Sequence, residues 1–337
     1  MNDWKNYADL YNTTRQQRIN QKKPNENPVT DDIKSKFGRA GTIPSPVILD
    51  LDGDGVETTA VKAGAYFDHA SDGFAEQTGW VGKDDGLLVR DLNGNGTIDT
   101  GAELFGSETK LANGTKAANG FEALKELDQN NDGKIDASDT AFATLKIWKD
   151  ANGDGYTSAG ELLTLADAGV QSINVGYTNS ALVDANNNQH EQVGSYTTAA
   201  GQTRTAEDVW FQTDTTYSIA TTWLDVPADI AALPDASGYG KVYDLRQAMV
   251  RDTSGSLKNL VTQFTQATTV AERETLLQSI IYKWTGVENV DPNSRAATQI
   301  YGNVIGDARK LEALEEIMGE DWYGVWCWGT KVSISVQ

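Results

Sequence analysis

The stretch Asp128-Gln-Asn-Asn-Asp-Gly-Lys-Ile-Asp-Ala-Ser-Asp139 decides the fold of this chain. Oxygen-bearing side chains stand at its first, third, fifth, ninth and twelfth places, and a glycine stands at its sixth. This is the spacing of an EF-hand calcium loop, in which the seventh residue adds its carbonyl oxygen. We expect Ile135 to anchor the loop in the core. The expected calcium ligands are Asp128, Asn130, Asp132, Lys134, Asp136 and Asp139.

A second stretch repeats the pattern in full. Its expected ligands are Asp150, Asn152, Asp154, Tyr156, Ser158 and Glu161, with Gly155 at the turn. Apolar residues three and four apart predict helices over Phe121–Leu127 and Thr140–Trp148. The second of these helices would leave one loop and enter the next, so it would couple the two sites.

Two further segments keep part of the spacing. The first offers Asp91, Asn93, Asn95, Thr97, Asp99 and Glu103, although Glu103 comes one residue late, through an insertion or a rearranged ligand set. The second offers Asp50, Asp52, Asp54, Val56 and Glu57, but it has no acid at its twelfth place. We expect its remaining ligand to come from elsewhere. The candidates are Asp68, Asp72, Asp84 and Asp85.

Asp-Gly and Asn-Gly strings also form ordinary turns. Four such strings between Asp50 and Glu161, two of them with complete ligand spacing, favour a metal over turns alone. Carboxylate and amide oxygens with no nearby histidine or cysteine favour calcium over zinc or copper, and magnesium is a weak competitor. We therefore expect three to four calcium ions, and a segment 47–200 that is loose without calcium and compact with it.

Composition limits the class of protein. The 337 residues include 48 aspartates and glutamates against 28 lysines and arginines, which argues against nucleic-acid binding. The one cysteine, Cys327, excludes an intramolecular disulfide. We find no apolar run of membrane-spanning length and no N-terminal signal peptide. The expectation is a protein that is cytosolic or is exported without such a peptide.

Three regions follow from the pattern along the chain. Residues 1–45 predict a polar segment with a short helix over Trp4–Tyr11. Residues 46–212 predict an α+β, EF-hand-like calcium-loop domain with short helices and a small β-hairpin from strands Val170–Val175 and Gln192–Tyr196. The chain is expected to become helical from Ala206, and residues 213–337 to form a small all-α domain. Its predicted helices are Asp244–Arg251, Ser256–Ala267, Val270–Tyr282 and Ala308–Met318, with a capping box at Thr269 and Glu272.

Several motifs together resemble a known family. They are Pro46-Val-Ile-Leu-Asp-Leu-Asp-Gly-Asp-Gly-Val-Glu57, Gly79-Trp80, Asp84-Asp-Gly-Leu-Leu-Val-Arg-Asp-Leu-Asn-Gly-Asn-Gly96, Gly101-Ala-Glu-Leu-Phe-Gly106, Leu127-Asp128, Trp148 to Gly155, Glu161-Leu162 and Gly194-Ser-Tyr196. The combination, over about residues 46–212, resembles the self-processing module of iron-regulated RTX proteins. The tail from Trp223 to Leu314 resembles a segment found beside that module.

The resemblance implies type I secretion through an uncleaved C-terminal signal, and hence an extracellular protein. It also implies calcium-triggered cleavage of an Asp-Pro bond. In that reaction the aspartate carboxylate attacks its own carbonyl, and a lysine amine captures the resulting anhydride as an isopeptide. Here the corresponding bond is Ser45-Pro46, and serine has no carboxylate. The chain's one Asp-Pro bond, Asp291-Pro292, predicts a turn between two helices.

Three functions remain open. The chain could be a calcium-dependent folding module without chemistry of its own, a single-turnover enzyme acting on itself at Ser45-Pro46, or a scaffold whose helical domain docks a protein partner. His69 and His190 are expected in loops or solvent, with His69 near calcium as an alternative. Cys327 is expected to be a buried apolar residue between tryptophans. The residues Trp322, Trp326 and Trp328 and the run Val332–Val336 predict either packing or a secretion signal or adhesive edge.

Overall fold

The computed structural model of the protein describes residues 45–294, 304–305, 307–321 and 334–335. Two compact units divide the chain between Asp214 and Thr215. We call the described residues 45–214 the N-terminal unit and those from 215 onward the C-terminal unit. The expected helix Trp4–Tyr11, Cys327 and the three C-terminal tryptophans lie outside the described residues.

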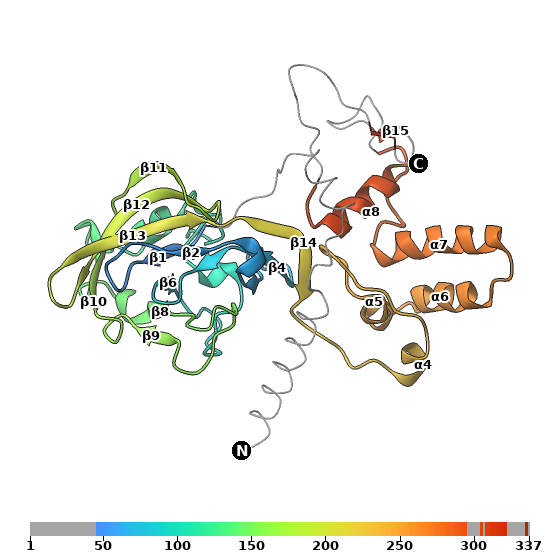
Figure 1. Cartoon of the computed structure of the whole chain (residues 1–337), viewed down its shortest axis with the longest axis horizontal. Coiled ribbons are helices and arrows are strands. Elements are labelled where there is room, and N and C mark those ends of the chain that lie inside the picture. The colour runs from blue at the N-terminus through green and yellow to red at the C-terminus, as the bar shows by residue number, and fades with distance from the viewer. Residues whose placement is uncertain (1–44, 295–303, 306, 322–333, 336–337) are drawn as a thin grey trace. The chain divides into compact units, whose positions relative to one another are not determined.

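A curved, nine-stranded sheet forms the centre of the N-terminal unit (Figure 1). Its strands follow the order β7, β10, β12, β13, β1, β6, β8 and β9, and β11 also pairs with β12. The bounds are β1 Val47–Leu49, β6 Gly86–Val89, β7 Lys134–Ile135, β8 Lys146–Trp148, β9 Leu162–Thr164, β10 Val170–Asn174, β11 Thr178–Val183, β12 Gln189–Thr198 and β13 Thr203–Trp210. These pairings are antiparallel.

Both faces of the central strands are covered, which explains their unbroken apolar runs. In β1, Val47 and Leu49 pack into one core cluster with Leu88, and Ile48 packs into a second cluster with Leu87. All five side chains are fully buried. The sheet therefore lies between two apolar layers, and the loops that leave its strands begin from a rigid base.

Short elements complete the unit. They are β2 Thr58–Thr59, the 3-10 turn η1 Val61–Ala63, β3 Tyr66–Phe67, β4 Phe74–Thr78, β5 Trp80–Val81, the 3-10 turn η2 Gly101–Glu103, α3 Gly120–Lys125 and the 3-10 turn η3 Phe142–Thr144. β3 pairs with β4, and β2 pairs with β5. Helix α3 agrees with the helix expected over Phe121–Leu127, and the Asn119 side chain caps it by accepting the Glu122 amide.

The expected α+β fold with EF-hand helices is wrong, because a β-sheet carries the acidic loops. The segment Thr140–Trp148 forms η3 and then β8 rather than one helix. Ile147 pairs with Leu88 of β6 and Leu163 of β9, so burial inside a sheet overrides the helical spacing. The chain also does not become helical at Ala206, which lies in β13.

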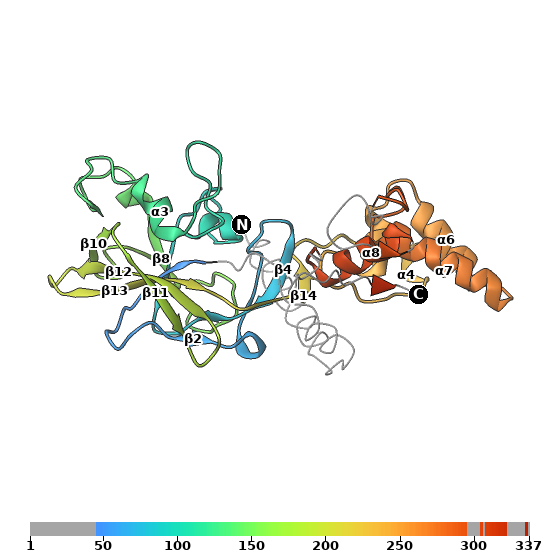
Figure 2. The ribbon, with the colours of Figure 1, turned by 90° about the horizontal axis from the view of Figure 1, so that it is seen from above.

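The C-terminal unit is not all-α either. Strand β14 (Thr213–Ala220) enters it, and β15 (Val304–Ile305) pairs in parallel with β16 (Ile334–Ser335), within the Val332–Val336 run. Its helices are α4 Ala228–Ala231, α5 Leu245–Arg251, α6 Ser256–Gln266, α7 Val270–Trp284 and α8 Ala308–Met318 (Figure 2).

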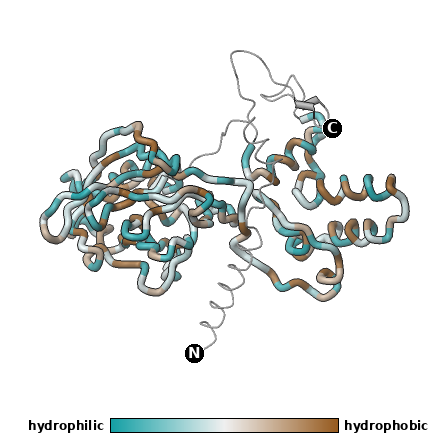
Figure 3. The backbone as a smooth tube through the Cα atoms, in the orientation of Figure 1, coloured by the Kyte–Doolittle hydropathy of each residue, from teal (hydrophilic) through white to brown (hydrophobic). Residues whose placement is uncertain are grey.

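The last four helices agree with the sequence prediction, and the capping box at Thr269 and Glu272 is confirmed. Apolar and polar residues alternate along α6 and α7, as amphipathic helices require (Figure 3). Asp291 accepts the Ser294 amide, so the Asp291-Pro292 bond starts a turn as expected. No helix within the described ranges is both long and apolar enough to cross a membrane.

Replacing Leu88 by alanine should destabilise the N-terminal unit. Leu88 is fully buried in β6, and a Leu→Ala change at such a site costs about 2–5 kcal/mol. Leu182 of β11 is 55% exposed, so Leu182→Ala should change the free energy of unfolding by about 0.5 kcal/mol or less. Urea unfolding in saturating calcium measures both. Equal losses in the two variants would contradict this placement of the core.

Candidate metal centres

The first aspartate of each loop gathers backbone amides. Asp128 accepts the amides of Asp132 and Gly133 at 3.2 and 2.9 Å, through different carboxylate oxygens. Asp91 accepts the amides of its fourth and sixth loop residues, Gly94 and Gly96, at 2.7 and 2.9 Å. Glycines at these places have positive φ, which bends the loop tightly around the carboxylate.

A second carboxylate closes each loop from the opposite end. In the Asp128 loop, Asp139 accepts the amide of the second residue, Gln129, at 2.9 Å and that of the ninth, Asp136, at 3.1 Å. In the Asp150 loop, Glu161 accepts the amide of the ninth residue, Ser158, at 2.8 Å. The two acids expected at twelfth places therefore face their loops, as a bidentate calcium ligand must.

The late acid of the Asp91 loop occupies the same place. Glu103 accepts the amides of Leu92 and Asp99 at 3.0 and 2.8 Å, which are again the second and ninth residues. The 3-10 turn η2 absorbs the extra residue, and Glu103 is buried at its end. The Asp91 loop thus contains one inserted residue. Its closing acid, Glu103, still contacts the same two loop positions that Asp139 contacts in the Asp128 loop.

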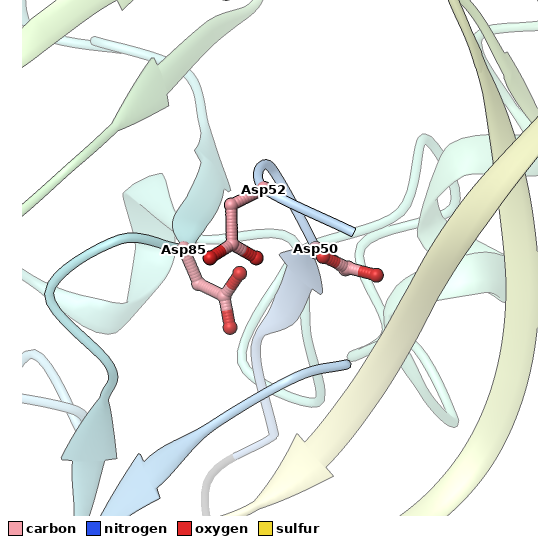
Figure 4. A group of neighbouring side chains, drawn as sticks. All are labelled: Asp50, Asp52 and Asp85. Carbon is pink, nitrogen blue, oxygen red and sulfur yellow. The ribbon is translucent and has the colours of Figure 1, made fainter. Parts of the chain in front are cut away.

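The Asp50 loop obtains its closing carboxylate from a distant segment. β1 and β6 pair with Leu49 opposite Gly86, which brings Asp50 beside Asp85. Asp85 accepts the amides of Leu51 at 3.2 Å and Glu57 at 2.9 Å, which are the second and eighth residues of this loop, whereas Glu103 and Asp139 accept those of the second and ninth residues of theirs. Carboxylate oxygens of Asp50, Asp52 and Asp85 lie within 4.8 Å of one another (Figure 4).

Of the four candidates for the remaining ligand, Asp85 is the one that the structure places beside Asp50 and Asp52. Asp84 is exposed, and Asp68 and Asp72 lie in a separate turn between β3 and β4. The sequence allowed this answer but could not choose it, because the choice depends on the pairing of two strands.

Crowded carboxylates raise one another's pKa. Burial raises the pKa of Asp85 to about 6, and the charge of Asp50 adds to that rise. Burial also raises the pKa of Glu161, with the charges of Asp150 and Asp154 contributing. The hydrogen bond shared with Asp52 raises the pKa of Asp54 to about 6. Burial is the main cause of the shifts at Asp85 and Glu161, and the neighbouring negative charge that adds to them is what a bound cation would relieve.

The Asp128 loop has a partial counter-charge of its own. Lys134 lies 2.7 Å from Asp136, and their contact lowers the pKa of Asp136 to about 2. Ile135 is fully buried, as expected of the anchor residue.

Coupling between loops differs from the expectation. No helix joins the Asp128 and Asp150 loops. Instead, the Ile98 amide of the Asp91 loop donates to the Thr157 hydroxyl of the Asp150 loop at 2.9 Å. Both residues hold the eighth place, so these two loops are the pair in contact.

The donor set suits a hard cation. The loops carry carboxylate and amide side chains, whose oxygens calcium prefers, and in the Asp50 loop three carboxylates lie close together. His69 lies in a turn, as expected, but it is buried rather than solvated, and His190 lies in strand β12 rather than in a loop. His69 is buried beside Phe67 and Trp80, and burial lowers its pKa to about 3. His190 contacts Glu207 and Asp184.

The Ser45-Pro46 bond lies at the entrance to β1. Ser45 is 3% exposed, and its hydroxyl accepts the Ser107 amide at 3.1 Å. Beside it lies Asp208 of β13, a fully buried carboxyl that no motif in the sequence singled out. Burial raises the pKa of Asp208 to about 7, and hydrogen bonds from the Gly120 amide and the Ser45 side chain oppose part of that rise.

Comparisons with known proteins agree with the resemblance seen in the motifs. Residues 47–212 match the SPM domain family. The chain is similar to the iron-regulated protein FrpA of Neisseria meningitidis serogroup C, with 46% identity over 241 residues. That alignment covers 71% of this chain and 21% of FrpA, so the chain spans about a fifth of that relative's length. The expected likeness to iron-regulated proteins is confirmed, and the match begins directly after Ser45-Pro46.

Asp208→Asn should change how stability depends on pH. Folded Asp208 keeps its proton up to about pH 7, whereas an unfolded aspartate loses it near 3.8. Because the folded state holds the extra proton, stability is lost as pH rises from about 4 to 7, by roughly 1.4 kcal/mol per unit. Asparagine has no such proton, so the stability of the variant does not fall over this pH range for that reason. The variant should therefore be more stable than the wild type at pH 8, with the difference vanishing towards pH 4.

Asp184→Asn is the matched control, with the opposite sign. Burial acts to raise the pKa of Asp184, but hydrogen bonds from Thr58 and the Asn188 amide outweigh it and leave the pKa lowered. This variant should be less stable than the wild type at pH 8. Urea unfolding in saturating calcium at several pH values measures both, and parallel curves for wild type and Asp208→Asn would contradict the assignment.

Proposed function

We propose that the N-terminal unit is a calcium-gated folding module of a secreted RTX-type protein. The observation that carries the proposal is the shared construction of the four loops. Each has a first and a closing carboxylate oriented by backbone amides, and in the Asp50 loop the closing carboxylate, Asp85, comes from another strand. Such convergence of oxygens is what a calcium ion of six to eight ligands needs.

Calcium would stabilise the folded unit because the unfolded chain cannot gather these ligands. A ligand that binds only the folded state adds about 2.7 kcal/mol per site at a hundred times its dissociation constant. Without the ion, carboxylates such as Asp50 and Asp85 repel each other across the β1–β6 pair. The module would stay loose where free calcium is scarce, and would fold after export into a calcium-rich medium.

Calcium titration of the chelated protein tests this function. Circular dichroism should show a large gain of β-structure, and the melting temperature should rise steeply. Magnesium at the same concentrations should give neither change, because it demands a tighter octahedral site. If calcium leaves both measurements unchanged, the loops are ordinary turns and the proposal fails.

Adjacent aspartates supply a matched pair for the Asp50 site. Asp85→Asn removes the carboxylate that closes the loop, so this variant should bind one calcium ion fewer. Asp84→Asn removes the same charge from an exposed neighbour and should bind as the wild type does. Equal calcium counts in the two variants would exclude Asp85 as a ligand.

Self-processing is the second candidate function, and the surroundings of Ser45 favour it. Hydrogen bonds hold the residues on both sides of the Ser45-Pro46 bond. Ser107 donates to the Ser45 hydroxyl at 3.1 Å, and Val209 donates to the Pro46 carbonyl at 3.0 Å. The buried carboxyl of Asp208 lies beside the Ser45 hydroxyl. What this chain lacks is a carboxylate at position 45, so we expect the natural chain to stay whole.

Ser45→Asp should restore cleavage if the remaining machinery is intact. With calcium, this variant should give two fragments, 1–45 and 46–337, on a denaturing gel. Ser45→Asn, of the same shape but without a carboxylate, should remain whole. A Ser45→Asp protein that folds with calcium, as judged by circular dichroism, and still stays whole would show that the mechanism is lost beyond position 45.

A further inference from the structure

The turn between β3 and β4 repeats the hydrogen bonds of the metal loops. Asp68 accepts the amides of Asp72 and Gly73, the fifth and sixth residues counted from it, at 3.1 and 2.9 Å. Asp72 in turn accepts the amide of Phe74, the seventh, at 3.1 Å. In the Asp128 loop the fifth, sixth and seventh residues make the same three bonds.

The backbone angles agree as well. Ser71, the fourth residue, has φ of 57°, and Gly73, the sixth, has φ of 93°. The corresponding residues of the Asp128 loop, Asn131 and Gly133, have φ of 58° and 87°. A positive φ is uncommon for a residue other than glycine, so the two turns share an unusual path.

Glu76 provides evidence for a ligand that is independent of the turn geometry. It is the ninth residue from Asp68, a ligand place in the other loops, and it is only 9% exposed. Its Oε2 atom has no hydrogen-bond partner among the residues that the structure describes. Leaving such an oxygen buried and unpaired is costly, so it needs an explanation.

The β3–β4 register places Glu76 opposite Phe67, at the strand end where the turn with Asp68 begins. Burial raises its pKa to about 8, and the charges of Asp72 and Asp68 add to that rise. The His69 amide acts in the opposite direction because it lies beside the carboxyl. His69 is the second residue from Asp68, and the amide at that place is the one that closing carboxylates accept in the loops.

We propose that Asp68, Asp72 and Glu76 bind a further calcium-class divalent cation, in a site distinct from the four loops. The Phe74 carbonyl, at the seventh place, would add a fourth oxygen. Ala70 and Gly79 hold the third and twelfth places and offer no side-chain donor. Water therefore completes the coordination, and this site fills after the four loops.

The position of the site gives it a structural consequence. The Gly101 amide donates to the Asp68 carbonyl at 2.8 Å, and Asp68 bridges to Thr100. Gly101 begins the turn η2 that ends at Glu103, the closing acid of the Asp91 loop. A cation at Asp68 thus fixes the segment from which Glu103 reaches its own loop.

Native mass spectrometry of the full chain in calcium tests the site by counting bound ions. The wild type should bind one ion more than the double variant Asp72→Ala/Glu76→Gln. Asp72→Ala alone should also lose that ion, and because Asp72 is exposed it provides a second variant should the double variant not fold. Asp167→Ala is the control. Asp167 is an exposed aspartate in another hydrogen-bonded turn, and its loss should leave the count at the wild-type value.

The outcomes separate this inference from the proposed function. If Asp72→Ala and wild type bind the same number of ions, the site at Asp68 is overturned while the four loops stand. If the wild type binds no calcium at all, both proposals fall. A count that drops by one in Asp72→Ala and stays constant in Asp167→Ala supports the site.

Discussion

The antiparallel register of three central strands is the constraint on which the rest of the N-terminal unit depends. Leu49 lies opposite Gly86, and Leu87 lies opposite Trp148, so β1 ends, β6 begins and β8 ends at one edge of the sheet. Asp50 and Asp85 meet there because those pairs are fixed. A slip of one residue would exchange the two buried faces and part these carboxylates. The packing of two apolar layers therefore determines which acids meet in the proposed metal sites of the folded unit.

At that end of the sheet, backbone amides attract the carboxylates, whereas the carboxylates repel one another. Hydrogen bonds from amides to ionised carboxylates contribute about 1.5–3 kcal/mol each, and the loops make several of them. They do not remove the cost of burying charge or the smaller repulsion from neighbouring acids, which together raise the pKa of Asp85 and Glu161. Amides fix where the oxygens point, and a cation would supply the missing positive charge. The backbone amides thus orient the carboxylates in full, but the chain itself neutralises their negative charge only in part.

The spacing of residues along the chain predicted the features that depend only on near neighbours in the sequence. The Asp128 and Asp150 loops follow their expected places because each ligand set lies within twelve residues of chain, and α5 to α8 follow from helical periodicity and caps. Asp85 needed the β1–β6 register, which no local pattern contains. The strand at Ile147 was taken for a helix because a short apolar run fits both periods, and burial between β6 and β9 decides it. No pattern in the sequence indicated that Asp208 would be buried, since a polar residue in a strand ordinarily faces water.

Strand β1 also explains how a calcium ion in the Asp50 loop could influence the Ser45-Pro46 bond, although neither Ser45 nor Pro46 is a proposed ligand. Pro46 precedes β1 and Asp50 follows it, with three fully buried residues between them. The Asp50 amide donates to Thr205 and the Val209 amide donates to Pro46, so one partner strand, β13, holds both ends. Ordering of the Asp50 loop by an ion would order β1 against β13, and hence the Ser45-Pro46 bond beside Asp208. The chemistry at position 45 depends on its side chain, whereas a coupling to calcium would depend on the sheet and not on the residue at position 45.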